Sequence, residues 1–160
     1  MRILVVVLLA ALLVVLPLPS AHAGAAPDTS PPSGAINPNV TQSNIAQTIC
    51  RPGWTATVRP PESYTYELKR QQMAARHLPG RPGDYQEDHY VPLEIGGHPT
   101  DPRNLWPQPW PEARLKDMLE RALNRAVCGG KLTLADAQRC LLNQLWTTCA
   151  RRMHTHVPLM

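Results

Sequence analysis

Residues 111–128 constrain the fold most strongly, because they carry one continuous apolar face at helical spacing. The apolar positions recur at i, i+3, i+4, i+7, i+8, i+11 and i+12, and they are Leu115, Met118, Leu119, Ala122, Leu123, Ala126 and Val127. This period predicts an amphipathic α-helix. Pro111 suits its first turn, and Gly129-Gly130 suits its C-terminal cap.

A second helix is predicted to start at Thr133, which forms a capping box with Asp136. Its inward-facing residues are Leu134, Ala137, Leu141 and Leu145. We expect the two helices to form a hairpin. An earlier helix is predicted over 63–78, between a Pro-Pro and a Pro-Gly pair, whereas residues 41–50 suit either a short helix or an extended arm.

The block "DHYVPLEIGGHPTDPRNLWPQPW", residues 88–110, separates these helices. Tyr90, Val91, Leu93 and Ile95 predict a short strand, and Asn104-Leu105-Trp106 predict a second one. Turns are expected at Gly96-Gly97 and Asp101-Pro102. The order strand, loop, strand, helix indicates a single α+β domain, and the sequence contains no internal repeats.

The first 23 residues have the pattern of a signal peptide. A basic Met1-Arg2 precedes a 16-residue apolar run over 3–18, and Ala21-His22-Ala23 supplies a small-x-small cleavage site. The run is shorter than the ~20 residues that a membrane-spanning helix needs. We expect cleavage before Gly24 and a secreted or periplasmic protein; an uncleaved anchor is the alternative.

Residues 24–38 are rich in Pro, Ala, Ser and Gly, which predicts a flexible leader ahead of a domain over 39–160. Without Arg2 the chain has 15 basic and 12 acidic residues. This small positive charge is compatible with a polyanionic partner without demanding one.

Four cysteines, Cys50, Cys128, Cys140 and Cys149, lie in the exported part. An even number in an oxidising compartment predicts disulfides, with three possible connectivities. If Cys140 and Cys149 lie on one helix, their Cα atoms are about 13 Å apart, while a disulfide needs less than about 7 Å. That pair therefore requires a broken helix. No C-x-x-C spacing supports a zinc site.

The block at 88–105 carries the chemistry. Asp88-His89, Pro92, Gly96-Gly97 and Asn104-Leu105 resemble the HNH nucleases, the ββα-metal group. The chain is also similar to a subfamily of exported bacterial HNH proteins in "TIC", "VRPPESYT", "LKRQQ", "KDMLE" and "LADAQR". The resemblance covers residues 39–146 and implies a hairpin–helix core around a divalent metal.

Phosphodiester hydrolysis needs an activated water and stabilisation of negative charge. An imidazole with a pKa near ~6.5 can accept the proton of the water, and a hard cation prefers carboxylate oxygen. We therefore expect His89 to be the general base and Asp88 a ligand of Mg²⁺, Mn²⁺ or Zn²⁺. The resemblance implies that Asn104 orients the imidazole. Without a site, Asp88 and Asn104 would be turn residues and His89 a surface histidine.

The sequence departs from the HNH pattern because no histidine lies between Asn104 and His154. Glu112 is the first replacement for the third metal ligand, since helical spacing places it on the side of Leu119 and Leu123. Preference for the helix dipole explains Glu112 equally well. Asp117 ranks second, because it projects away from the apolar face.

Several further residues are weaker candidates. Lys69, Arg70, Arg103 and Lys116 are predicted phosphate contacts, together with Arg76, Arg114 and Arg121, and each also suits a solvated surface. Trp106 and Trp110 suit base stacking or the core. His98, His154 and His156 are expected to lie in an exposed loop and tail.

The resemblance also implies a Cys50–Cys128 disulfide, which leaves Cys140 and Cys149 free or partly paired. The predicted function is that of a secreted, metal-dependent endonuclease that cleaves DNA or RNA with little sequence preference. The alternative is a catalytically inactive HNH-fold module that binds nucleic acid or has a structural role in the cell envelope.

Overall fold

The computed structural model describes residues 32–143 and 149. The predicted signal peptide, the start of the leader, Leu145, Trp146 and both tail histidines lie outside these residues. The described part is a mixed α+β fold with a two-stranded antiparallel sheet and two disulfides. No described helix is both long and apolar enough to cross a bilayer.

The elements follow in the order η1 (Gln42–Asn44), α1 (Trp54–Val58), α2 (Glu62–Ala75), η2 (Pro82–Asp84), β1 (Tyr85–His89), η3 (Leu93–Ile95), η4 (Pro102–Asn104), β2 (Leu105–Pro109), α3 (Trp110–Cys128) and α4 (Leu134–Leu142), where η marks a 3₁₀-helix. The three helices predicted over 63–78, 111–128 and from Thr133 are confirmed as α2, α3 and α4. The segment 41–50, left open between a short helix and an extended arm, forms a 3₁₀-helix and turns.

The first predicted strand is wrong. Strand β1 ends at His89, and Tyr90 to Ile95 belong to the loop that follows it. Pro92 lacks a backbone N–H, and Gly96 has a φ of 74°, so this stretch cannot continue an extended ladder. Its apolar residues are buried because the loop folds over the core. The second predicted strand is confirmed as β2, with His89 opposite Leu105 and Tyr85 opposite Pro109.

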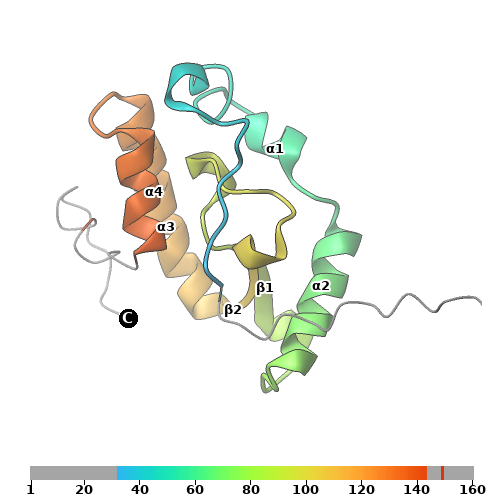
Figure 1. Ribbon diagram of the computed structural model, residues 1–160. Coiled ribbons are helices and arrows are strands. Elements are labelled where there is room, and N and C mark those ends of the chain that lie inside the picture. Colours follow the sequence, from blue (N-terminus) through green and yellow to red (C-terminus); the bar gives the residue numbers. More distant parts are fainter. Residues whose placement is uncertain (1–31, 144–148, 150–160) are drawn as a thin grey trace, which may run out of the picture.

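Helices α2 and α3 lie on the two sides of the hairpin, and α4 packs beside α3 (Figure 1). The core gathers apolar residues from the loop after β1, from α3 and from α4, among them Val91, Ile95, Leu119, Leu123, Val127, Ala137 and Leu141. Trp106 packs edge-on against Tyr90 at this core, as the core interpretation predicted. Trp110 instead is 41% exposed and donates from its indole N–H to the Gly83 carbonyl.

The last residues of the predicted flexible leader are ordered, which corrects the boundary at Asn39. Backbone bonds join the Gly34 N–H to the Arg103 carbonyl and the Asn37 N–H to the Gly96 carbonyl. Ile36 also forms an antiparallel bridge with Gly97. A Cβ on Gly97 would lie 1.7 Å from the Val91 carbonyl oxygen. The Gly-Gly pair is thus needed where the N-terminal segment crosses the loop.

The Cys50–Cys128 disulfide is confirmed, and it ties the N-terminal region to the end of α3. The expectation that Cys140 and Cys149 are free or partly paired is wrong, because they form the second disulfide with their Cα atoms 6.0 Å apart. Helix α4 ends at Leu142, so the chain breaks the helix between them as the distance argument required. Two disulfides fit an oxidising compartment.

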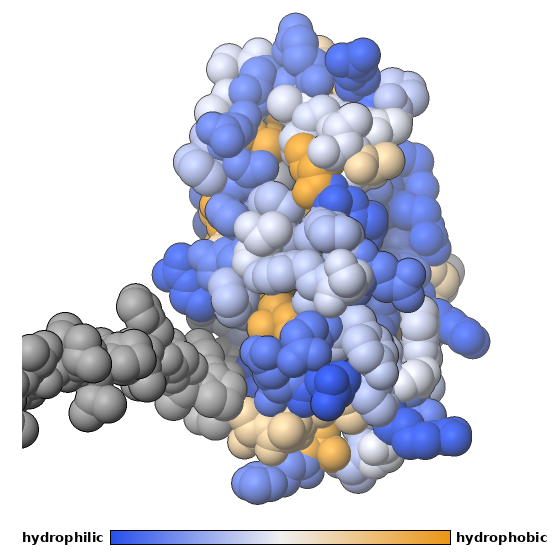
Figure 2. Space-filling model, turned by 90° about the vertical axis from the view of Figure 1, so that its right-hand side faces the viewer, coloured by the Kyte–Doolittle hydropathy of each residue, from blue (hydrophilic) through white to orange (hydrophobic). Residues whose placement is uncertain are grey.

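Figure 2 shows the side of the molecule that carries α2. Hydrophilic residues cover most of this face, and the hydrophobic areas on it are small and separate. The face therefore offers no broad apolar surface.

Candidate functional site

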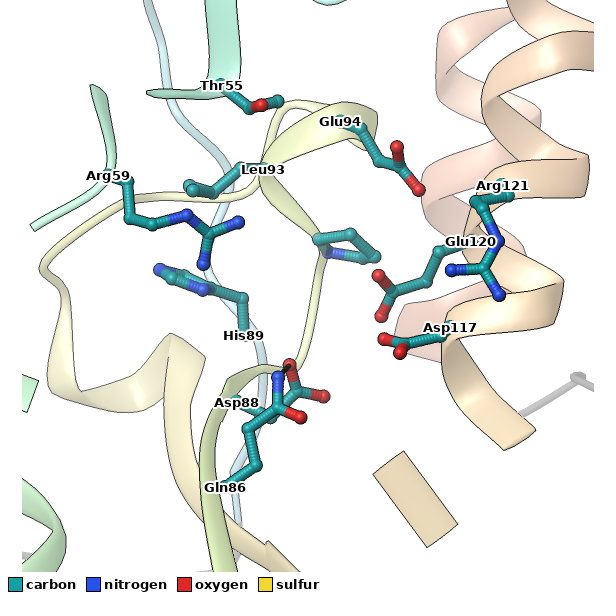
Figure 3. Close-up of a pocket in the computed structure, with 11 residues that line it drawn as sticks. Thr55, Arg59, Gln86, Asp88, His89, Leu93, Glu94, Asp117, Glu120 and Arg121 are labelled. Atoms are coloured by element: carbon teal, nitrogen blue, oxygen red, sulfur yellow. Dashed lines mark hydrogen bonds between the residues drawn. The ribbon is translucent and has the colours of Figure 1, made fainter. Parts of the chain in front are cut away.

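A pocket of about 240 Å³ opens where strand β1 ends, between the α1 region and the flank of α3. Its lining residues come from four segments: Thr55 and Arg59 from the α1 region, Gln86, Asp88 and His89 from β1, Pro92, Leu93 and Glu94 from the loop, and Asp117, Glu120 and Arg121 from α3. In Figure 3, His89 and Arg59 lie on one side of the pocket, and the acidic residues of α3 lie on the other. The structure thus brings Asp88, His89 and Asp117 of the predicted site together.

His89 is 5% exposed and lies at the last position of β1. Its Nε2 is 3.0 Å from the Pro99 carbonyl oxygen, which can only accept a hydrogen bond, so Nε2 carries the proton. Nδ1 has no hydrogen-bond partner among the described residues and keeps its lone pair available. Burial lowers the pKa of His89 to about 4, more strongly than the Pro99 bond and Asp88 raise it. The imidazole is therefore neutral at neutral pH.

Asp88 precedes His89 and points to the opposite side of the strand, toward α3. Its Oδ2 lies 2.7 Å from the Lys116 ammonium. Its Oδ1 accepts a longer bond of 3.3 Å from the Gln86 amide. One carboxylate oxygen is therefore tightly held, and the other has a neutral partner that can exchange.

The wall opposite His89 is acidic. Glu94 comes from η3, and Asp117 and Glu120 come from α3. Burial raises the pKa of Glu94 and of Glu120, although nearby cations oppose the shift in both cases. Asp117 has no hydrogen-bond or ion-pair partner among the described residues. This wall gathers carboxylates that a bound cation would stabilise.

Two arginines border the same pocket. Arg59 follows α1 and lies beside the imidazole, and Arg121 extends from α3 near Glu94 (Figure 3). Neither guanidinium has a hydrogen bond or ion pair shorter than 4 Å within the described part of the chain. Both are therefore available to an anion that enters the pocket.

Asn104 does not orient the imidazole, which corrects its predicted role. Its side-chain oxygen accepts from the backbone N–H groups of Val91 and Ala35, and its amide donates to the carbonyls of Val91 and His98. Asn104 is fully buried and ties both ends of the β1–β2 loop to the N-terminal segment. It thus shapes the loop whose Pro99 carbonyl holds His89.

Glu112, the first replacement for the third metal ligand, is exposed and does not line the pocket. Trp110, Pro111 and Glu112 are all exposed, whereas Ala113 of the same turn is buried, so the first turn of α3 packs through Ala113 and turns Glu112 to the surface. Asp117, ranked second, does line the pocket. It projects away from the apolar face as predicted, but the pocket lies along that flank of the helix.

Lys116 was predicted to contact phosphate, and this is wrong because its side chain is 0% exposed and binds Asp88. Of the other predicted contacts, Arg121 lines the pocket, whereas Lys69, Arg70 and Arg103 do not. Lys69 donates to the Tyr85 carbonyl, while Arg70 and Arg103 form exposed ion pairs with Glu67 and Asp101.

Sequence reasoning missed Arg59, Glu94 and Glu120. Glu120 lies four residues after Lys116, and this spacing of opposite charges on one helical face was the available signal. Arg59 lies in "VRPPESYT", one of the stretches that carry the resemblance, but only the fold brings it to the pocket beside His89.

No three described His, Cys, Asp or Glu residues converge as a ready-made metal centre. The donor chemistry nevertheless suits a hard cation, because Oδ1 of Asp88 and the unpartnered Asp117 carboxylate face one pocket. A cation there would draw these two side chains together.

Comparisons of this chain with protein families, with curated proteins and with solved structures find no match. The candidate site therefore stands on its own geometry.

Proposed function

We propose that this protein is a secreted or periplasmic endonuclease that hydrolyses phosphodiester bonds of DNA or RNA with the help of a divalent metal. One observation carries the proposal: the neutral imidazole of His89, whose Nδ1 is unpartnered among the described residues, lines a pocket with carboxylates on one wall and free guanidinium groups at its borders. Within this proposal, β1, β2 and α3 form the ββα-metal core.

His89 provides the base. A water in the pocket transfers its proton to Nδ1 while its oxygen attacks phosphorus and the bond to the departing oxygen breaks. The Nε2–H bond to Pro99 holds the ring in the tautomer that can accept this proton.

Asp88 and Asp117 are the residues that would hold Mg²⁺, Mn²⁺ or Zn²⁺. Such a cation, when bound, supplies Lewis-acid stabilisation of the charge on the phosphate and the departing oxygen.

Arg59 and Arg121 would bind the phosphate from the two sides of the pocket. Guanidinium contacts to phosphate carry no sequence information, which is why we expect little sequence preference.

The test is nicking of supercoiled plasmid by the oxidised protein with Mg²⁺, Mn²⁺ or Zn²⁺, and with EDTA. His89→Ala should lower the nicking rate by about 10²- to 10⁴-fold, the usual range for a general base. His98→Ala is the matched control, because His98 lies in the loop after β1 and does not line this pocket, and its ring Nδ1 accepts bonds from the Thr100 and Asp101 backbone N–H groups. Metal-independent nicking, or equal losses in both variants, would contradict the proposal.

A second candidate is a nucleic-acid-binding module without catalysis, favoured by the absence of a converged three-ligand group among the described residues. This protein would bind plasmid and RNA in a gel-shift experiment but cleave neither. Arg59→Ala would then weaken binding, whereas His89→Ala would not.

A further inference from the structure

Lys116 is the largest fully buried side chain of the described chain, and it lies near the start of α3. Its ammonium donates to Oδ2 of Asp88 at 2.7 Å, to the His89 carbonyl at 2.7 Å, and to Glu120. An ammonium has three N–H donors, and each has an acceptor here. Lys116 therefore holds two consecutive pocket residues, Asp88 by its side chain and His89 by its backbone.

A helix does not need a buried lysine merely to pack on a sheet. Burying an ammonium is costly unless carboxylates and further hydrogen bonds compensate it, and apolar residues of similar volume often give equal stability. Burial alone would lower the pKa of Lys116, but Glu120 and Asp88 outweigh it and raise the pKa above its ordinary value. The Lys116 ammonium therefore stays charged at a buried position where packing alone does not require a charge.

The contacts of Lys116 also determine which carboxylate oxygen of Asp88 can bind a ligand. Because Oδ2 is bound to the ammonium, only Oδ1 remains for a ligand in the pocket, and the Gln86 amide covers it at 3.3 Å. The bond to the His89 carbonyl fixes the backbone from which the imidazole extends toward Pro99.

We propose that Lys116 is a positioning residue, which holds Asp88 so that Oδ1 alone faces the pocket and holds His89 so that Nδ1 does. The inference rests on the proposed nuclease function, with Lys116 acting through these two residues rather than on the substrate.

The experiment compares Lys116→Met, which removes the donors, with Lys116→Gln, whose amide still donates to Asp88. Lys69→Met is the matched control, since Lys69 ties α2 to the Tyr85 carbonyl at the other end of the same strand, at 2.8 Å. Each variant is examined at a temperature where near-ultraviolet circular dichroism shows it folded. The two readouts are the nicking rate and the ¹⁵N signals of the His89 ring at pH 7.

Lys116→Met should lower nicking by about 10- to 100-fold, as loss of a supporting residue does in other sites. It should also give the His89 ring a second set of signals from the Nδ1–H tautomer. Lys116→Gln should recover part of the rate, and Lys69→Met should leave both readouts unchanged.

The inference is overturned if Lys116→Met keeps a single Nε2–H ring signal and nicks within threefold of the wild type, or if Lys69→Met changes both readouts equally. Should Lys116→Met fail to fold, the ring signals of Lys116→Gln decide, because its amide can replace the bond to Asp88 but not the one to the His89 carbonyl; a single Nε2–H signal in that variant overturns the inference. If the wild-type protein cleaves no nucleic acid, the proposed function fails, and the ring signals still decide whether Lys116 positions His89.

Discussion

Two adjacent acidic residues of strand β1, Asp88 and Glu87, lie in contrasting environments on the two sides of the strand. Asp88 faces α3, where the Lys116 ammonium and the Gln86 amide bind its oxygens. Glu87 faces α2, and neither of its buried oxygens has a hydrogen-bond partner. Burial raises the pKa of Glu87 to about 8, although the charges of Lys69 and Arg76 oppose this shift.

This difference shows that positive charges near a buried carboxylate do not replace direct hydrogen bonds to its oxygens. Alternation along a strand sends adjacent residues to opposite sides, so one acid enters the pocket and the other is buried under a helix. We expect the first to matter for chemistry and the second for stability alone.

The largest expected effect is a difference in nicking activity between substitutions of Asp88 and of Glu87. Asp88→Asn should lower metal-dependent nicking by about 100-fold or more, because a weaker cation ligand forfeits several kcal/mol of charge stabilisation. Glu87→Gln should nick within threefold of the wild type. Similar losses of nicking activity in the two folded variants would contradict the different roles of Asp88 and Glu87.

The next effect concerns stability on the α3 side. Lys116→Met leaves Asp88 and Glu120 buried without their ammonium, which should lower the free energy of unfolding by about 3–5 kcal/mol. Urea denaturation monitored by tryptophan fluorescence measures this change. A loss below about 1 kcal/mol would mean that the ion pair contributes little to the fold.

On the α2 side, stability should fall as pH rises from about 4.5 to about 8. The pKa of Glu87 is about 8 in the folded protein against an ordinary value of 4.5, so folding favours the protonated acid. Its contribution is complete below about pH 4.5 and is lost as pH rises through 8, a loss of roughly 3 kcal/mol after allowance for solvent screening.

Glu87→Gln cannot ionise and should lack that loss. The difference in unfolding free energy between wild type and Glu87→Gln, measured from pH 5 to pH 9, isolates the effect. His89 acts in the other direction, because its lowered pKa removes stability as pH falls from about 6.5 to about 4. A flat difference between pH 5 and pH 8 would contradict the raised pKa of Glu87.

The smallest effect is expected for Lys69→Met. Its bond to the Tyr85 carbonyl should contribute about 1–2 kcal/mol. Its charge lowers the pKa of Glu87, so the loss of stability with rising pH should extend to higher pH in this variant. Urea denaturation at several pH values measures both the loss of stability and its pH dependence. A shift of that dependence to lower pH would contradict the effect of Lys69 on the pKa of Glu87.

The sequence predicted the helices well because their apolar faces repeat with the helical period over many residues. Strand β1 was misplaced because "YQEDH" has one hydrophobic residue, Tyr85, and so no apolar alternation, whereas the apolar stretch after it contains Pro92 and Gly96. Burial of that loop depends on tertiary packing, which short-range periodicity does not encode.

The candidate site was predictable where its residues lie in one block, as Asp88 and His89 do. Lys116 was misjudged because a lysine is normally a surface residue, and its burial depends on the carboxylates of Asp88 from β1 and of Glu120 on its own helix. Arg59 reaches the pocket through the path of the chain between α1 and α2, which no local pattern specifies.

The Cys50–Cys128 disulfide has one more consequence. Every pocket residue, from Thr55 to Arg121, lies inside the covalent ring that this bond closes. Residues 79–81, 83 and 84, before β1, are exposed. A protease that cut the chain once at that point would leave both pieces attached to each other. His89 and Arg59 would then remain parts of one covalent molecule.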